Sequence, residues 1–209
     1  MFNRRRNLRF ATVRMAFICF LAFVSSLPVI PAQDTAGVPA FKITQAKSTI
    51  KFAVKASVPI EGTFQKWDAT FTVTSTAAES GVLDIKIQAA SVNTGSGMKD
   101  GKLKGKDFFN ADQDPHITFH STKIVQTGPE TFDIPGKFTI RGVTKDETLK
   151  LTGSGKGKGH GEITGTMAFD RKEYGMNSGI PFIKIADRVE VTVFLIVDRV
   201  SGPPLVFKQ

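Results

Sequence analysis

Hydrophobic and polar side chains alternate with a period of two residues along most of the chain from Ala40 onward. The apolar positions of the clearest segments are Ile50, Phe52 and Val54; Phe71 and Val73; Leu83, Ile85 and Ile87; Phe138 and Ile140; Leu149 and Leu151; Met167 and Phe169; and Val189, Val191, Val193 and Leu195. This period is typical of antiparallel strands that are buried on one face. Gly-rich or Asp/Pro turns separate the segments, so the sequence predicts an all-β protein.

The pattern predicts about eight strands and very little helix. No long amphipathic helix is found that would cover an open sheet, and closure of the sheet on itself would remove its exposed edges. We therefore expect a single antiparallel β-barrel of about eight strands rather than a sandwich. A barrel of this size is just wide enough either to be filled by side chains or to hold one small ligand.

The aromatic residues sharpen this expectation, because the chain has 18 Phe but one Trp and one Tyr. Phe has no polar tip, whereas Tyr and Trp are expected at a wet recognition surface. The inward phases of the strands predict an elongated apolar lumen lined by Phe52, Phe71, Ile85, Phe119, Phe138, Ile140 and Phe169. An ordinary packed core is the alternative.

A short segment between two predicted strands combines basic and apolar side chains. Its basic residues are Lys99, Lys102, Lys104 and Lys106, and its apolar residues are Met98, Leu103, Phe108 and Phe109. We expect a short helical segment near the mouth of the barrel, cationic on one side and apolar on the other. Such a segment could close over an amphiphile, or it could plug one end of the barrel while its lysines are merely solvated.

A turn and a strand follow this segment. Asp112, Asp114 and Pro115 predict the turn, and the next residues alternate so that Ile117 and Phe119 share one face. The other face carries His116, Thr118 and His120. Two histidines four residues apart lie about 13 Å apart along a strand, too far for one metal ion, so no metal site is predicted.

The same stretch carries a family resemblance. The motif Lys99-Asp100-x-x-Leu103-Lys104-x-x-Asp107-Phe108-Phe109, followed by Pro115–Phe119 and Ser121, resembles the signature of the YceI-like family of bacterial periplasmic lipid-binding proteins. Further matches are Gly136–Lys145, Asp170–Arg171 with Tyr174–Gly175, and the strand that begins at Asp187. The resemblance covers roughly residues 40 to 197. Lys102 stands where the family usually carries His, and Lys99 replaces an Arg.

The resemblance implies a lipocalin-like barrel whose lumen holds a long isoprenoid or other lipid chain, such as a quinone or polyprenyl phosphate. On this hypothesis Met98, Leu103, Phe108 and Phe109 close the barrel mouth. Lys99, Lys102 and Lys104 would meet the polar end of the lipid, and a homodimer is compatible with this arrangement. The alternative is a structural or stress-related periplasmic protein with a filled barrel that acts through a protein partner.

The N-terminus has the pattern of a secretory signal peptide. Five arginines precede the apolar run Met15–Val24, which is shorter than the roughly 20 residues of a membrane span. We expect cleavage after Ala32, leaving residues 33–209 as one lipid-binding domain in the periplasm or outside the cell; a retained anchor is the alternative. The residue before Cys19 is Ile18, which does not fit lipoprotein processing.

Several kinds of chemistry are not predicted. The Gly-rich run Gly153–Gly161 fits no phosphate-binding motif, no strand-turn-helix elbow presents a nucleophilic Ser, and Asp112 and Asp114 belong to a turn. Five of the 28 Lys and Arg residues and none of the 19 Asp and Glu residues lie in residues 1–32, so the remainder carries a formal charge of +4. These basic residues are dispersed among acids, so we expect no nucleic acid partner. Because the phosphate-binding and catalytic motifs are missing, we also expect no cofactor and no enzymatic activity.

Overall fold

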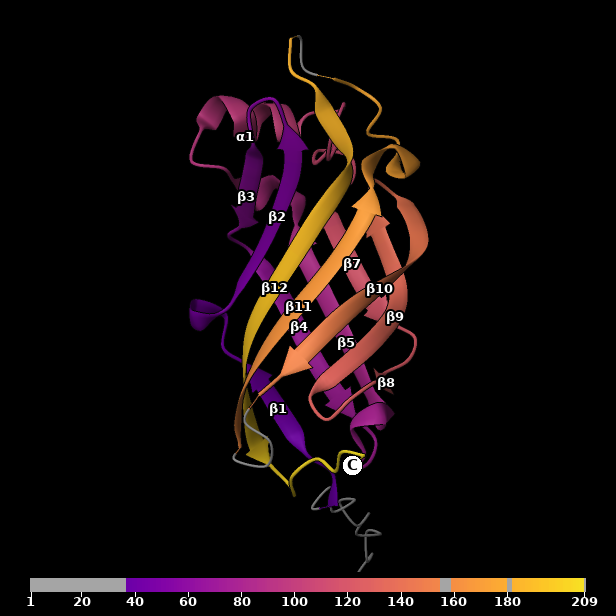
Figure 1. The fold of residues 1–209 in the computed structure, drawn as a ribbon. Coiled ribbons are helices and arrows are strands. Elements are labelled where there is room, and N and C mark those ends of the chain that lie inside the picture. Colours follow the sequence, from indigo (N-terminus) through magenta and orange to yellow (C-terminus); the bar gives the residue numbers. More distant parts are fainter. Residues whose placement is uncertain (1–36, 155–158, 180–181, 209) are drawn as a thin grey trace, which may run out of the picture. The chain divides into compact units, whose positions relative to one another are not determined.

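Twelve strands and one α-helix are present in the residues that the computed structural model describes, which are 37–154, 159–179 and 182–208 (Figure 1). The predicted signal peptide and its cleavage position lie outside these residues. The strands are β1 Ala40–Ile43, β2 Thr49–Ala56, β3 Ile60–Phe64, β4 Trp67–Val73, β5 Gly81–Gln88, β6 Val92–Asn93, β7 His116–Ser121, β8 Val125–Gln126, β9 Thr131–Ile140, β10 Val143–Gly153, β11 His160–Asp170 and β12 Ile185–Ser201. The helix is α1 Gly97–Lys104, and 3₁₀ turns occur at Gln45–Lys47, Ala78–Ser80, Ala89–Ser91 and Arg171–Tyr174.

The twelve strands occupy eight positions around a closed antiparallel barrel. Four positions are each shared by two strands: β1 with β2, β3 with β4, β5 with β6, and β7 with β8. β1 and β2 pair with β12, β3 pairs with β6, β4 pairs with β5, and β7 and β8 pair with β9. Together with the uninterrupted strands β9, β10, β11 and β12, these four positions give eight. The predicted all-β barrel is therefore confirmed, and the larger strand count arises because four of its positions are each split into two strands.

Two buried serines satisfy the backbone where strands are interrupted or end. The Ser48 hydroxyl follows the turn between β1 and β2; it accepts a hydrogen bond from the amide of Ile196 on β12 at 2.9 Å and donates to the Thr44 carbonyl at 2.8 Å. The Ser121 hydroxyl at the end of β7 accepts from the amide of Leu83 at 2.8 Å. A buried amide without a partner would cost about 1 to 3 kcal/mol, so these hydroxyls allow the sheet to bend without that penalty.

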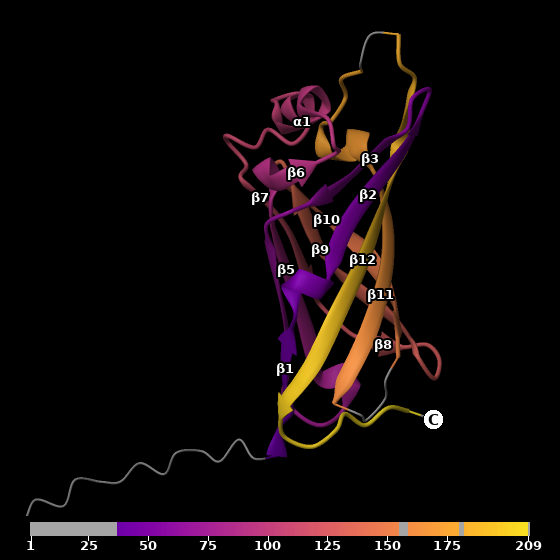
Figure 2. The same ribbon diagram turned by 90° about the vertical axis from the view of Figure 1, so that its left-hand side faces the viewer.

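The two ends of the barrel differ in what covers them. Figures 1 and 2 show α1 at one end, and β1, β8 and the C-terminal segment at the other. At the second end β1 and β4 form a seam that side chains close: the rings of Phe41 and Phe71 are 5.3 Å apart. The Gln45 amide also donates to the Asp68 carboxylate at 3.0 Å. No backbone ladder joins β1 to β4 within the described residues.

The core follows the predicted alternation. In β5 the burial alternates so that Leu83, Ile85 and Ile87 are buried, and in β7 Ile117 and Phe119 are buried while His116 and His120 are exposed. Gly136 on β9 makes room for one of these side chains, because a Cβ atom there would lie 2.6 Å from the ring of Phe119. A side chain at this position would thus collide with the core.

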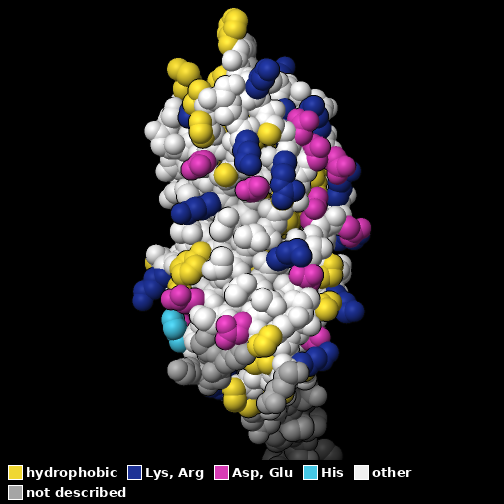
Figure 3. Space-filling model, in the orientation of Figure 1, with side chains coloured by type: hydrophobic (Ala, Val, Ile, Leu, Met, Phe, Trp, Pro, Cys, Tyr) yellow, Lys and Arg dark blue, Asp and Glu magenta, His cyan; other side chains and the backbone are white. Residues whose placement is uncertain are grey.

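The outer surface carries acidic and basic side chains side by side. On the face in Figure 3, Lys and Arg alternate with Asp and Glu, and hydrophobic side chains are scattered among them. Among the described residues, no helix is both long enough and apolar enough to cross a membrane.

Candidate functional site

Two apolar cavities lie inside the barrel. The larger, about 160 Å³, lies at the end of the barrel near the C-terminus; among the described residues, its lining is apolar or glycine except for Glu130, Ser154, His160 and Arg199. The smaller, about 60 Å³, lies beneath α1, and Arg171 is its one polar lining residue among those described. Both cavities are therefore suited to hydrocarbon.

A layer of inward-facing residues separates the two cavities. On β5, Leu83 lines the larger cavity and Ile87 the smaller, while Ile85 between them lines neither. The same order holds on β9, β11 and β12. The layer comprises Ile85, Phe119, Gly136, Leu149, Gly165, Met167 and Val193. The lumen in this structure is thus two cavities instead of the single elongated one expected from the sequence.

All seven residues predicted to line the lumen lie on the inward side of their strands. Phe52, Phe138, Ile140 and Phe169 line the smaller cavity, and Phe71 lines the larger. The remaining two, Ile85 and Phe119, are register partners on β5 and β7 and belong to the dividing layer. Their role in ligand binding stays a prediction.

The predicted mouth segment forms α1 and the loop after it. Leu103, Phe108 and Phe109 are buried and line the smaller cavity, and the Phe109 ring packs against Phe52 and Phe64 at centroid distances of 6.1 and 5.7 Å. Met98 does not join them, because its side chain is 87% exposed. The expectation that Met98 packs over the lumen is wrong: it occupies the outer side of the first helical turn.

None of the three lysines predicted to meet a polar group lines either cavity. Lys102 forms an ion pair of 2.8 Å with Asp107, and its ammonium lies 5.7 Å from the centre of the Phe108 ring. That hydrogen bond and charge keep the pKa of the Asp107 carboxyl below its usual value. Lys99 is exposed, and Lys104 is partly exposed. In this structure the lysines therefore lie on the outer side of a segment that plugs the barrel. This was the alternative drawn from the sequence, in which the lysines are merely solvated.

Asp100 anchors α1 to the barrel. Its carboxylate accepts hydrogen bonds from the Thr94 amide at 2.8 Å and the Thr94 hydroxyl at 2.7 Å. These two bonds hold the pKa of the Asp100 carboxyl below its usual value. Asp100 of the YceI-like motif thus has a structural role, because its carboxylate ties the helix to the segment that follows β6.

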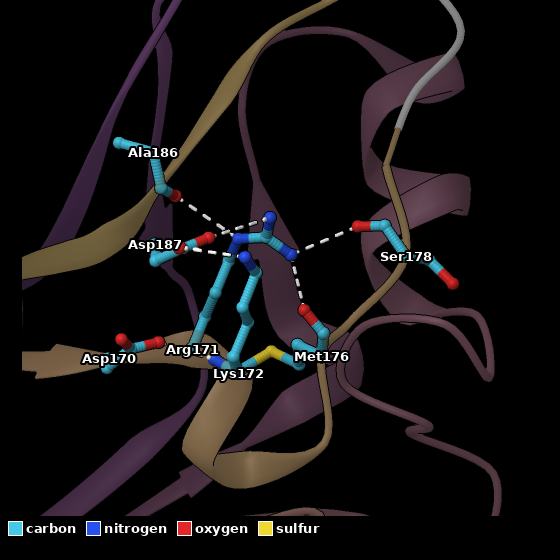
Figure 4. Close-up of polar contacts among 7 residues, drawn as sticks. All are labelled: Asp170, Arg171, Lys172, Met176, Ser178, Ala186 and Asp187. Atoms are coloured by element: carbon cyan, nitrogen blue, oxygen red, sulfur yellow. Dashed lines mark hydrogen bonds and ion pairs between the residues drawn. The ribbon is translucent and has the colours of Figure 1, made fainter.

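A buried arginine organises the loop beside the plug, and its role was not foreseen from the sequence. The guanidinium of Arg171, 6% exposed, donates to the carbonyls of Ala186 at 3.1 Å, Ser178 at 3.0 Å and Met176, and contacts Asp187 at 3.3 Å (Figure 4). Lys172 pairs with the other oxygen of Asp187 at 2.9 Å. The Asp170–Arg171 and Asp187 motifs therefore meet in one cluster that holds the loop against the barrel.

Tyr174 completes this end of the barrel. It is fully buried, its ring packs edge-on against Phe138 and Phe169, and its hydroxyl donates to Glu147 at 2.9 Å. Burial, followed by the contact with Glu147, raises the pKa of the Tyr174 hydroxyl well above its usual value. The single Tyr of the chain is therefore a neutral structural donor.

At the opposite end, a segment after β12 covers the larger cavity. Pro204, Leu205 and Phe207 line this cavity, and the Phe207 ring lies 6.0 Å from that of Phe132. Arg199 also lines this cavity. Because Arg199 lies on the same face of β12 as Leu195 and Val197, its guanidinium is an inward-facing cation on an otherwise apolar strand face. The alternation of β12 continues beyond Leu195, and extending this pattern would have predicted from the sequence that Arg199 faces inward.

The histidines form surface pairs with carboxylates. His120 contacts Asp84 at 2.5 Å and His160 contacts Asp198 at 2.6 Å, with all four side chains substantially exposed. Within the described residues, no cluster of three or more His, Cys, Asp or Glu side chains could hold a metal ion. Nothing in this part of the chain supports a metal centre at His116 or His120.

Comparison with known proteins agrees with this architecture. The model of the YceI-like domain matches residues 41–196. A UPF0312 protein of Pseudomonas savastanoi pv. phaseolicola is 30% identical over 133 residues, which are 61% of this chain and 69% of the relative. A UPF0312 protein of Azotobacter vinelandii is 33% identical over 97 residues, or 46% of this chain and 50% of the relative.

Solved structures show the same fold. The crystal structure of Burkholderia cenocepacia BcnA matches with a TM-score of 0.67 and 28% identity, covering 74% of this chain and 99% of BcnA. A polyisoprenoid binding domain from Saccharophagus degradans matches with a TM-score of 0.61, covering 77% of this chain and 99% of that domain; at 14% identity it supports the fold alone. Because the family model spans most of the chain and its motifs build both the plug and the arginine cluster, this protein belongs to the YceI-like family.

Proposed function

We propose that this protein is an exported carrier for a long-chain isoprenoid-type lipid, such as a polyprenyl phosphate or a quinone. The observation that carries the proposal is the pair of apolar cavities lined by the inward faces of the strands. A hydrocarbon chain needs apolar walls and exclusion of water, and both cavities offer them. The description of the Saccharophagus degradans domain as polyisoprenoid binding gives the ligand class to test first.

The energy of such binding is sufficient without any catalytic group. Burying about ten CH₂ groups at about 0.8 kcal/mol each contributes about 8 kcal/mol. This is the scale of a micromolar complex before the cost of ordering the chain is subtracted. A binding role without catalysis also agrees with the family to which the chain belongs.

Native mass spectrometry of the exported protein tests the proposal. We expect a co-purifying apolar mass that is retained by the wild type and lost from Phe71→Asp, which places a charge in the wall of the larger cavity. Glu162→Gln on β11 is a matched control, because Glu162 lies on the exposed phase of its strand. A protein that never carries or takes up a lipid would favour the alternative, a filled barrel that acts through a protein partner.

Export is part of the same proposal. The arginines and the apolar run before Pro28 support cleavage after Ala32. N-terminal sequencing of the protein recovered from the periplasm or the medium should then begin at Gln33. Recovery of an uncleaved chain with the membranes would instead support a retained anchor.

A further inference from the structure

The two ends of the barrel are closed in different ways. At the α1 end, Leu103, Phe108 and Phe109 are buried inside the barrel and Asp100 ties the helix down. The loop beside them is held by the buried Arg171. Opening this end would therefore disrupt core packing as well as a satisfied buried charge.

At the other end, the C-terminal segment Gly202–Lys208 lies across the larger cavity. Gly202 has φ +77 and turns the chain sharply, because a Cβ atom there would lie 2.4 Å from the Val38 carbonyl oxygen. The segment then forms a short parallel bridge, in which Val206 donates to Thr76 at 2.7 Å and accepts from Ala78 at 3.2 Å. Val206 is 63% exposed, whereas its neighbours Leu205 and Phe207 line the cavity.

Exposed polar contacts complete the attachment of this segment. The backbone of Lys208 exchanges two hydrogen bonds with the Gln126 side chain, at 2.7 and 2.8 Å, and its ammonium pairs with Glu79 at 2.6 Å. Such contacts contribute little each because water can replace them. The segment can thus separate from the barrel while the strand ladders stay intact, and doing so uncovers the larger cavity.

A cation stands at the edge of this cavity. Arg199 is the last inward-facing residue of β12 before the C-terminal segment, and it donates to the Gly202 carbonyl. The carboxylate of the adjacent Asp198 pairs instead with His160, at 2.6 Å. A guanidinium has five N–H donors in a planar fork that suits phosphate or carboxylate oxygens, and the Gly202 contact occupies one side of it.

We propose that an amphiphile enters the larger cavity at the end covered by Gly202–Lys208, and that Arg199 binds its anionic group there. The proposal rests on the proposed lipid-carrying function and adds to it an entrance, an orientation and a ligand class. The hydrocarbon chain points toward the dividing layer, and the phosphate or carboxylate stays at the rim. This places the polar end opposite to the lysines of α1.

A reversible disulfide tests the entrance. In the full chain carrying Cys19→Ser, the bridge partners Ala77 and Val206 are both changed to Cys, because bridged backbones bring two Cα atoms within disulfide range. Both positions are exposed, so the crosslink leaves the cavity unfilled. The α1 lock joins the start of the helix to the segment that follows β6 by Thr94→Cys with Asp100→Cys, whose native side chains already meet at 2.7 Å.

Uptake of cis-parinaric acid, a fluorescent long-chain carboxylate, is measured by stopped flow for both locks, oxidised and reduced. We expect the oxidised C-terminal lock to slow uptake by more than about tenfold and reduction to restore it, while the α1 lock has no effect. Slow uptake with the α1 lock, or unchanged uptake with the C-terminal lock, overturns the entrance. A wild type that binds no lipid probe overturns the proposed function, and the entrance with it.

Ligand class is tested with two competitors that share one chain. Arg199→Gln should weaken binding of farnesyl phosphate by about tenfold and leave binding of farnesol unchanged. Arg188→Gln, an exposed arginine on the same strand, should change neither. If Lys99→Ala with Lys102→Ala weakens farnesyl phosphate instead, the polar end lies at α1 and the assignment to Arg199 is wrong.

Discussion

At the scale of single residues, the dividing layer sets how far a chain can reach. Phe119 is the largest side chain of that layer, and its ring occupies the space that Gly136 leaves open. A ligand confined to the larger cavity would end against this ring. A longer chain would have to displace it in order to reach the smaller cavity.

Phe119→Ala should therefore extend the range of chain lengths that bind. We expect tighter binding of prenols longer than farnesol, together with a loss of stability of about 3 to 5 kcal/mol. Competition against cis-parinaric acid with a series of prenols measures the first effect, and thermal unfolding measures the second. Trp67→Ala, which also removes a buried ring but lines neither cavity, should destabilise without changing the preferred length.

Tyr174 predicts how stability depends on alkaline pH. Its pKa is raised in the folded protein, whereas in the unfolded chain it titrates near 10. Above that pH the unfolded chain loses the proton first, so the free energy of unfolding should fall as pH rises. Urea unfolding between neutral pH and pH values above about 10 measures the slope, which Tyr174→Phe should reduce. An unchanged slope in that variant would mean that other groups cause the loss.

At the scale of elements, the packing of the loop between β11 and β12 depends on the guanidinium of Arg171. Arg171 joins the 3₁₀ turn after β11 to the start of β12 and to the loop between them (Figure 4). The carbonyl groups that it satisfies come from three separate positions in the sequence. A substitution at this site should therefore affect the whole end of the barrel.

Arg171→Met is expected to destabilise the protein by about 3 kcal/mol, because it leaves carbonyl groups and Asp187 without their buried partner. Arg188→Met on β12 is the control, since Arg188 is exposed and pairs with Glu190 at 3.6 Å. Chemical unfolding gives both free energies. Hydrogen exchange should also show faster exchange near Met176 and Ala186 in the Arg171 variant alone. Equal stability of the two variants would contradict the proposed role.

At the scale of the whole molecule, binding by apolar walls should not require a metal. Elemental analysis of the purified protein after dialysis should find no stoichiometric zinc or iron, and treatment with a chelator should leave lipid binding unchanged. The side chains of the pairs His120–Asp84 and His160–Asp198 are exposed to solvent. A tightly held metal would contradict this prediction and would indicate a metal site at those histidines.

Much of the architecture could be predicted from the sequence because strand phase is a local property. The inward positions of Phe52, Phe138 and Phe169, the exposed histidines of β7 and the turn before it all follow from alternation and turn chemistry. The splitting of strand positions could not be predicted in this way. It depends on hydroxyls such as Ser48, which bonds to a residue 148 positions away.

The sequence by itself determined the class of fold, the apolar character of the lumen and the family, since each is recorded in the order of residues along one strand or motif. Tertiary structure alone decided that the lumen is divided, that the α1 segment is a plug, and that Arg199 stands at the edge of the larger cavity. The reason is physical: a cavity is the space left after side chains from distant strands have packed. Its size and its exits are therefore properties of the closed barrel and of no single strand.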